Sequence, residues 1–324
     1  MSFLHSHSSE CVKSELDQFT TPPTQTSMEN SQFVYYNRVS TLSDDAPIEF
    51  IVPGHGEEFI DLAHTMIKVR ARILKPEGTA AVDDSVGPVV TPPNNLYVYS
   101  AYIETLLNYG THAKSSHLGM SLWAMDSYGA MDSTAVATGD ARNNNGLAAR
   151  QAFTIGGTTF DLLGYLHCSV FNQDKFLING VELRVRLIRA KDDYCLMDDT
   201  AQNYKLHIEE ASLIVRRVKL SPGILIAHAK TLAKTTAKYP LTRVEVKSFV
   251  LHRGIMGETI DDALLGQLPK RIILGFVENA SFNGSRKKNP FNFQNFGINF
   301  LCRMSMDVKY LQNLCSEVSP LASA

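Results

Sequence analysis

The sequence predicts an all-β protein, and two observations carry that prediction. Apolar and polar residues alternate over several stretches, most regularly from Val181 to Leu187 after an Asn179-Gly180 pair. Long stretches rich in Gly, Pro and Asn separate these runs, and no strand–helix–strand rhythm is present. Alternation places apolar side chains on one face of a half-buried strand, and strand-rich segments between polar loops favour packed sheets. We expect one or two antiparallel β-sandwiches.

The run after Asn179-Gly180 has the best-specified register. Asn-Gly is typical of a type I′ hairpin turn, because that turn needs positive φ at two successive residues. Burial of the four apolar side chains contributes up to about 6–12 kcal/mol, whereas a slip by one residue would bury arginines instead. We therefore expect one apolar face, Val181, Leu183, Val185 and Leu187, and one wet face, Glu182, Arg184 and Arg186.

The N-terminal third is expected to begin with an arm and continue as strands. Residues 1–32 are rich in Ser, Thr, Gln and Pro and predict a disordered arm. Alternation predicts strands over 47–52 and 65–74. A proline-rich loop then covers 83–95. The spacing changes to that of a helix over 101–108.

The remaining elements follow from the same patterns. The polar stretch 126–145 predicts an exposed, mobile insertion. Alternation predicts a long strand over 204–220, and Ser221 is placed to cap a short helix over 224–234. Further strands are predicted over the following ranges: 152–155, 160–163, 167–171, 242–251, 271–277 and 298–301.

Composition and motif searches argue against several function classes. The 324 residues carry 31 basic and 33 acidic side chains, so no long-range field marks a general binder of nucleic acid or membranes. No apolar run reaches the roughly 18 residues of a membrane span, and the N-terminus lacks the features of a signal peptide. Five widely spaced cysteines predict neither a disulfide framework nor a zinc site. We expect an intracellular protein that is not secreted and has no transmembrane segment.

The sequence contains no standard catalytic motif. Phosphate loops, nucleophile elbows and Cys/His metal spacing are absent. His5, His7 and Glu10 match the residue types of a cupin metal site, but they stand in the arm rather than on rigid strands. Adjacent carboxylates such as Asp192-Asp193 fall in loops, where solvated turns are the favoured interpretation. We expect no catalytic residue, no cofactor and no metal.

Two clusters near the C-terminus leave alternatives open. The basic run 286–288 is interpreted as a solvated turn, with a nuclear signal or a nucleic-acid contact as the alternative. Phe291, Phe293 and Phe296 are too apolar to stand exposed in a loop. Core packing at the end of a sandwich is the first interpretation, and an interface anchor is the second.

Several long blocks resemble one protein family. These blocks are similar to the hexon-like major capsid proteins of Maverick/Polinton elements and adintoviruses, whose copies recur in animal genomes: 102–110 (YIETLLNYG), 176–187 (FLINGVELRVRL), 237–247 (AKYPLTRVEVK), 266–271 (GQLPKR) and 284–301. The resemblance covers approximately Ile48 to Leu301. It implies two jelly rolls per chain, assembly into trimers that build an icosahedral shell, and no active site.

The resemblance also implies a domain division and partners. We expect a first jelly roll over 33–220, a partial second one over 221–301 and an unrelated or disordered tail over 302–324. The chain departs from the family pattern between Pro88 and Asn95 and after Leu301, which predicts a truncated, genome-resident copy. Expected partners are further copies of the chain, as a homotrimer, and other capsid subunits, in a virion or inside the cell. No membrane contact and no specific nucleic-acid site are expected.

Candidate interface residues follow from these arguments: Arg184, Arg186, Phe291, Phe293 and Phe296. Two other functions compete with a capsid role. The first is a co-opted intracellular jelly-roll module that binds capsid chains or a ligand. The second is a metalloenzyme of cupin type, for which only His167 and His207 fall within predicted strands.

Overall fold

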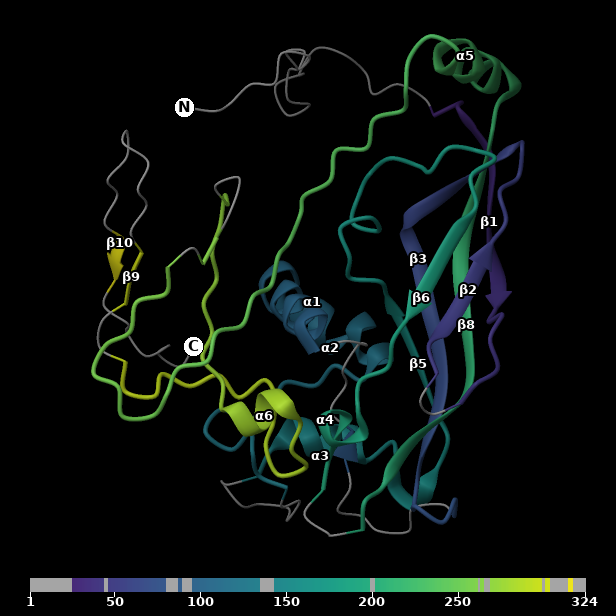
Figure 1. Ribbon diagram of the computed structural model, residues 1–324. Coiled ribbons are helices and arrows are strands. Elements are labelled where there is room, and N and C mark those ends of the chain that lie inside the picture. Colours follow the sequence, from purple (N-terminus) through teal and green to yellow (C-terminus); the bar gives the residue numbers. More distant parts are fainter. Residues whose placement is uncertain are drawn as a thin grey trace.

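The computed structural model describes most of the chain and shows a β-sandwich with irregular segments beside it (Figure 1). The described residues are 25–43, 46–79, 87–88, 95–134, 143–198, 202–261, 263–264, 269–298, 301–303 and 314–316. The predicted cluster of His5, His7 and Glu10 lies outside them. The described residues contain no helix long and apolar enough to cross a membrane.

Four strands form the larger sheet of the sandwich. Their order across the sheet is β1 (Met28–Asn37), β8 (Lys205–Leu220), β3 (Glu58–Leu74) and β5 (Phe160–Tyr165), and every neighbouring pair is antiparallel. The smaller sheet pairs β2 (Ile48–Val52) with β6 (Leu183–Leu187), also antiparallel. Most of the predicted strands in this part of the chain are therefore confirmed.

The strand pairs are nested in the order that defines a jelly roll. The first strand pairs with β8, the second with β6 and the third with β5, so the chain folds back on itself like one long hairpin rolled into two sheets. Jelly rolls have this two-sheet, double Greek-key arrangement. The predicted all-β jelly-roll class is confirmed. The domain boundaries stay a prediction.

The two sheets enclose the first core of the molecule. Phe50 and Val52 of β2 face Leu213 and Val215 of β8, and all four side chains are fully buried. Val185 of β6 packs into the same cluster. Alternation explains this layer, because every second residue of β2 points inward while its neighbours point to solvent.

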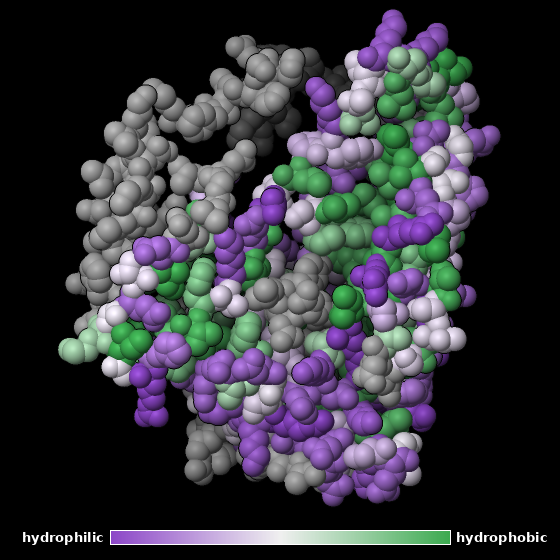
Figure 2. Space-filling model, in the orientation of Figure 1, coloured by the Kyte–Doolittle hydropathy of each residue, from purple (hydrophilic) through white to green (hydrophobic). Residues whose placement is uncertain are grey.

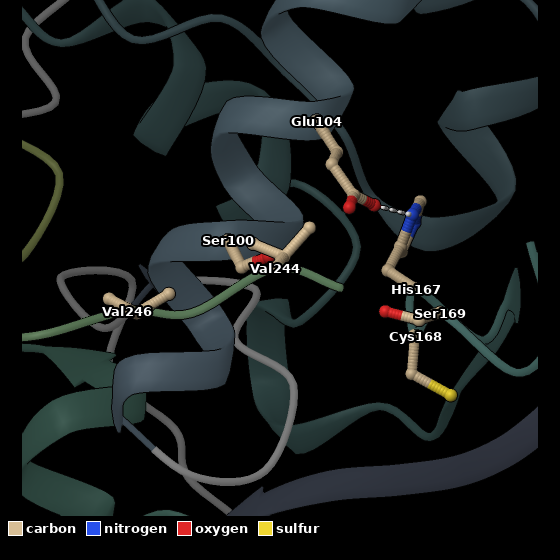
Figure 3. Close-up of a pocket in the computed structure, with 7 residues that line it drawn as sticks. All are labelled: Ser100, Glu104, His167, Cys168, Ser169, Val244 and Val246. Carbon is tan, nitrogen blue, oxygen red and sulfur yellow. Dashed lines mark ion pairs between the residues drawn. The ribbon is translucent and has the colours of Figure 1, made fainter. Parts of the chain in front are cut away.

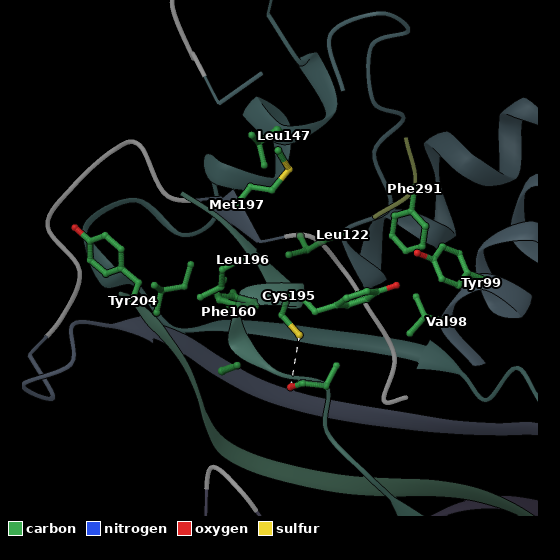
Figure 4. Close-up of a cluster of buried hydrophobic side chains, with 14 residues drawn as sticks. Val98, Tyr99, Leu122, Leu147, Phe160, Cys195, Leu196, Met197, Tyr204 and Phe291 are labelled. Atoms are coloured by element: carbon green, nitrogen blue, oxygen red, sulfur yellow. Dashed lines mark hydrogen bonds between the residues drawn. The ribbon is translucent and has the colours of Figure 1, made fainter. Parts of the chain in front are cut away.

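A second core lies at one end of the larger sheet, between the sheet and the helices (Figure 4). It is covered by α1 (Asn95–Asn108), α3 (Asn145–Gln151) and α4 (Asp192–Cys195). Figure 4 shows Val98 and Tyr99 of α1 facing Phe291, which is far along the chain. Shorter elements join them: α2 (Thr111–Ser115), η2 (His117–Ser121), η3 (Ile155–Gly157), and the paired two-residue strands β4 (Gly87–Pro88) and β7 (Leu196–Met197).

The Asn179-Gly180 turn differs from the prediction. Only Gly180 has a positive φ, +78°, so the turn is not type I′. Leu177 bridges to Ile60 of the larger sheet, whereas Leu183 pairs with β2 of the smaller one. The turn therefore transfers the chain from one sheet to the other instead of closing a hairpin. The alternation is confirmed from Leu183 to Leu187, because Val185 is buried and both arginines of β6 are exposed, but the predicted apolar face is wrong for Val181, which is exposed.

Several other boundaries also differ from the sequence-based prediction. Strand β1 begins at Met28, inside the segment predicted to be a disordered arm. Residues 152–155 and 167–171 form turns rather than strands. The helix α5 (Pro222–Leu232) confirms the prediction after Ser221, although the Ser221 side chain makes no capping hydrogen bond.

The predicted strands over 242–251 and 271–277 are absent, because both segments are extended without a ladder. β-propensity alone does not hold a strand that lacks a neighbour, so an apolar alternating segment without a partner stays irregular. The chain then forms α6 (Asn279–Asn283) and a short antiparallel pair, β9 (Leu301–Arg303) with β10 (Leu314–Ser316).

Candidate functional site

A cleft opens between α1, the connection after β5 and an extended segment from the C-terminal part (Figure 3). Its volume is about 250 Å³. Glu104 stands on α1 and faces His167 across the cleft, with Nδ1 of His167 3.7 Å from Oε2 of Glu104. The Asn172 amide donates to the same carboxylate oxygen at 3.4 Å. Val244 and Val246 of the extended segment also line the cleft.

The cleft contains side chains that can bind a ligand, but its described residues do not form a hydrogen-bonded set of the catalytic kind. Ser169 and Cys168 line it, but among the described residues neither makes a hydrogen bond to the His167 ring. The His167 and Glu104 side chains are each about three-quarters buried, so both are partly shielded from water. Within the described residues, no three His, Cys, Asp or Glu side chains come together as a metal site. A carboxylate beside an imidazole suits a ligand that carries hydrogen-bond donors.

The most unusual surface is residues 236–275, which we call the connecting segment. Within its described residues, no backbone–backbone hydrogen bond joins it to the rest of the chain. Large apolar side chains stand exposed along it, among them Phe249, Val250, Leu251, Ile255, Met256, Ile273 and Leu274. Contiguous exposed apolar side chains of this kind mark interaction surfaces.

The space-filling view places hydrophobic surface on the sandwich as well. Figure 2 shows a largely hydrophilic lower end, whereas hydrophobic side chains reach the surface higher up on the sandwich side. Exposed large apolar residues of the β1 and β6 regions include Phe33, Tyr35, Val181 and Ile188. The polar lower end and the apolar upper part give the molecule two chemically different surfaces.

The five candidate interface residues lie in three different places. Arg184 and Arg186 stand on the outer face of β6 and are strongly exposed. Arg184 pairs with Glu182, and Nε of Arg186 lies 3.3 Å from Oε1 of Glu49. These ion pairs lie across or beside a two-stranded sheet and are of the weak, solvated kind. Neither arginine packs into the core, so both positive charges are accessible to a neighbouring molecule.

The aromatic cluster divides between core and surface. Phe291 is 5% exposed, and its ring stacks on Tyr102 with the centroids 4.1 Å apart. Phe293 packs beside Tyr99 at 5.8 Å. Phe296 is 54% exposed and has a φ of 52°. The core interpretation fits Phe291 and Phe293. Of the three phenylalanines, only Phe296 is exposed enough to contact another molecule.

A buried polar cluster holds this aromatic segment in place, and sequence analysis missed it. Asp126 and Arg150 form an ion pair at 2.6 Å with both side chains about 95% buried. The Asn289 side chain, fully buried, donates to Asp126 at 2.8 Å, and its backbone N–H donates to Asp132 at 2.8 Å. Asp126 and Asn144 are therefore structural parts of the core, although the stretch 126–145 was predicted to be an exposed insertion.

The basic run 286–288 is also placed differently from the prediction. Arg286 is largely buried, donates from Nε to Asp193 at 2.7 Å and from Nη2 to the Tyr204 carbonyl at 2.8 Å. Lys288 reaches Glu278 at 3.0 Å and Asp132 at 3.7 Å. The run does lie in a turn, with Lys287 exposed and the Lys288 side chain 38% exposed, so the solvated-turn interpretation is wrong only for the largely buried Arg286. Residues 278–298, called the docked segment below, are thus attached by both charge and aromatic stacking.

Burial also changes the titration of the aromatic residues around this segment. Burial, helped by the nearby Asp126 carboxylate, raises the pKa of Tyr102 to about 12. Burial likewise raises the pKa of Tyr99 and of Tyr194. These phenols stay neutral over a wide pH range because an ionised ring would lie in a poorly hydrated site.

Comparison with known proteins gives distant similarities. No family model matches the chain. The chain is 22% identical over 309 residues to an uncharacterized protein of Caenorhabditis elegans, a match covering 86% of this chain and 70% of that protein. It is also similar to a chain in the cryo-EM structure of the Sputnik virophage, with 12% identity, a TM-score of 0.41 and coverage of 68% of this chain. The match spans about half, 53%, of that virophage chain.

Proposed function

We propose that this protein is a structural, capsid-type subunit that works by associating with further copies of itself and has no catalytic activity. The observation that carries the proposal is that a jelly-roll sandwich and a long segment of exposed apolar side chains occur in the same chain. Jelly rolls serve as building blocks of viral shells, among other roles. The resemblance of the sequence blocks to hexon-like capsid proteins supports the same role.

Energetics favour association through the connecting segment. Each large apolar side chain left in water forgoes about 1.5–3 kcal/mol that burial would release. Phe249, Val250, Leu251, Ile255 and Met256 form a nearly continuous exposed group. A protein that works as an isolated monomer rarely keeps such a patch exposed. Assembly as a homotrimer and closure into an icosahedral shell are the finer form of the same proposal.

Size analysis of the full-length protein tests this proposal. We expect discrete oligomers by light scattering coupled to size-exclusion chromatography, and closed particles or regular trimers by electron microscopy. Val250→Glu places a charge in the connecting segment and should dissociate the oligomers. Val39→Glu is the matched control, because Val39 is 63% exposed and Val250 66%. A monomer that stays monodisperse at high concentration would contradict the proposal.

A second candidate function is a ligand-binding module, favoured by the cleft beside Glu104 and His167. The cleft is lined by both polar groups and valines, which is the usual composition of a small-molecule site. Under this alternative the purified protein is monomeric, and ligands with hydrogen-bond donors shift its melting temperature. Glu104→Gln should remove that shift without changing the oligomeric state.

A further inference from the structure

We propose that the docked segment is exchanged between copies, so that residues 278–298 of one copy occupy the docking site of a neighbouring copy in the assembly. This inference rests on the proposed function, because exchange needs copies held close together. Beyond the proposed function, exchange would identify residues 278–298 as the contact that joins one subunit to the next.

The docking site and the docked segment are chemically complementary. The site is acidic and aromatic: Asp126, Asp132, Asp193, Tyr99 and Tyr102 all belong to the sandwich and its helical end. The segment is basic and aromatic, and it supplies Arg286, Lys288, Asn289, Phe291 and Phe293. The bond between the buried side chains of Asn289 and Asp126 makes the docking specific, because a segment lacking Asn289 would leave the buried carboxylate with one partner fewer.

The site is also deep enough to hold the segment without help from the intervening chain. The Asn289 side chain is fully buried, and Phe291 stacks on Tyr102 inside the second core. Central, desolvated aromatic and polar anchors carry most of the free energy of an interface. The same contacts form whether the segment comes from its own chain or from another copy.

The connecting segment allows both arrangements. Its first part is held by Tyr239, whose hydroxyl donates to the Phe176 carbonyl at 3.2 Å and accepts from the Ile178 N–H at 3.0 Å. From residue 247 to residue 275 the described chain is mostly exposed and has no backbone–backbone hydrogen bond to the rest of the described structure. A random coil of this length would have an end-to-end distance of about 30 Å, and a fully extended chain of the same length would span about 95 Å. A neighbouring copy is within that reach.

Concentration decides between the two arrangements. Since the docking contacts are identical, the free energies differ only through chain closure, which varies slowly with the length of the connecting segment. A tether of this kind gives an effective concentration on the order of millimolar. In dilute solution the segment therefore docks on its own chain. Copies packed side by side in a shell reach comparable local concentrations, and exchange then joins them without any new surface.

A cross-linking experiment on the full chain distinguishes exchange from intrachain docking. Unlabelled and nitrogen-15-labelled proteins are mixed in equal amounts before assembly, and the oligomeric fraction is treated with a carbodiimide that joins amines to touching carboxylates. The pair to follow is Lys288 with Asp132, 3.7 Å apart. The control pair is Lys68 with Asp161, 4.0 Å apart on neighbouring strands of the larger sheet.

With exchange, cross-linked peptides from Lys288 and Asp132 carry mixed labels in a fraction that approaches half. Those from Lys68 and Asp161 stay unmixed. Oligomers whose Lys288–Asp132 peptides are also unmixed would overturn the exchange and leave the proposed assembly intact. If no oligomer forms under any condition, the proposed function fails and exchange fails with it. Asn289→Ala removes a contact that both arrangements share, so it should lower the total yield of Lys288–Asp132 cross-links several-fold, whereas Asn295→Ala should leave that yield unchanged.

Discussion

The docked segment and the connecting segment both follow α5 and both lack a sheet, yet they differ in how they are held. The docked segment places Asn289 and Phe291 among buried side chains. The connecting segment has neither ladder hydrogen bonds to the described chain nor a buried face, and Met256 on it is fully exposed. An irregular backbone therefore does not show how firmly a segment is attached, because the side-chain contacts determine the attachment.

The difference has a chemical origin. The docked segment satisfies its polar groups through side chains of the sandwich, as in the bond from Asn289 to Asp126. The connecting segment carries apolar residues and alternation suited to a sheet, such as Val244 and Val246, but no strand lies beside it in the described structure. The first segment finds its contacts in the described structure, whereas the apolar side chains of the second would be covered only in the proposed assembly.

The largest difference in stability between the two segments is expected when the stacked ring of Phe291 is removed. Phe291→Ala removes a buried aromatic side chain and should lower the free energy of unfolding by about 3–5 kcal/mol. The matched control is Phe249→Ala in the connecting segment, where the ring is 48% exposed and the change should be below about 1 kcal/mol. Urea denaturation can be followed through Trp123, the only tryptophan, whose ring lies 5.3 Å from Tyr102. Equal losses in both variants would contradict the comparison.

The buried ion pair gives the next largest effect. Asp126→Asn leaves the Arg150 guanidinium buried without its carboxylate, and we expect a loss of about 3 kcal/mol in unfolding free energy. Glu245→Gln removes the exposed partner of Arg243 in the connecting segment and should cost no more than about 0.5 kcal/mol. Denaturant titration at neutral pH measures both. A small loss for Asp126→Asn would mean that the docked segment is attached less firmly than its contacts indicate.

Alkaline pH should lower the free energy of unfolding through Tyr102 in the docking site. The neutral phenol of Tyr102 is the form that the folded protein stabilises, because its pKa is about 12 in the fold against about 10 in the unfolded chain. Its contribution is therefore complete below pH 10 and is lost between about pH 10 and 12, by roughly 2–3 kcal/mol. Tyr102→Phe should make the loss of stability over this range less steep. Tyr128→Phe, at an 84% exposed position, should not.

The smallest effect on stability is expected from cutting the connecting segment. Trypsin should cleave first after Arg243, Lys247 or Arg253, because exposed backbone without hydrogen bonds opens at little cost. The unfolding free energy of the nicked protein should stay within about 0.5 kcal/mol of the intact one, with the two fragments associated through the docking site. Mass spectrometry of early digestion products identifies the sites. First cleavage at Arg286 would reverse the comparison.

Sequence periodicity predicted the sandwich because its strands have partners. The alternation of β2, of the second half of β3 and of β8 is enough to identify inward residues such as Phe50 and Leu213. The same kind of alternation over 242–251 predicted a strand that is absent, since pairing depends on what lies alongside and not on the segment itself. The transfer between sheets at Gly180 was equally invisible, because Asn-Gly is compatible with several turns.

The docking site was partly predictable. The cluster of phenylalanines from Phe291 to Phe296 predicted a packed aromatic group, and the structure places Phe291 on Tyr102. The polar part was missed because Asp126 and Asn289 are 163 residues apart and stand in stretches with the composition of solvated loops. Only the three-dimensional arrangement shows that their polar groups satisfy one another.

The pairing of β1 with β8 also determines how late in synthesis the first of the described strands can find its neighbour. Met28 lies opposite Leu220, so the first strand emerging from the ribosome has no neighbour until almost two hundred further residues have been synthesised. At roughly 5–20 residues per second, that delay is about 10–40 s. During it, the aromatic residues Phe33 and Tyr35 are carried on an unpaired strand. Slower translation therefore lengthens the time for which β1 lacks its only neighbour in the larger sheet.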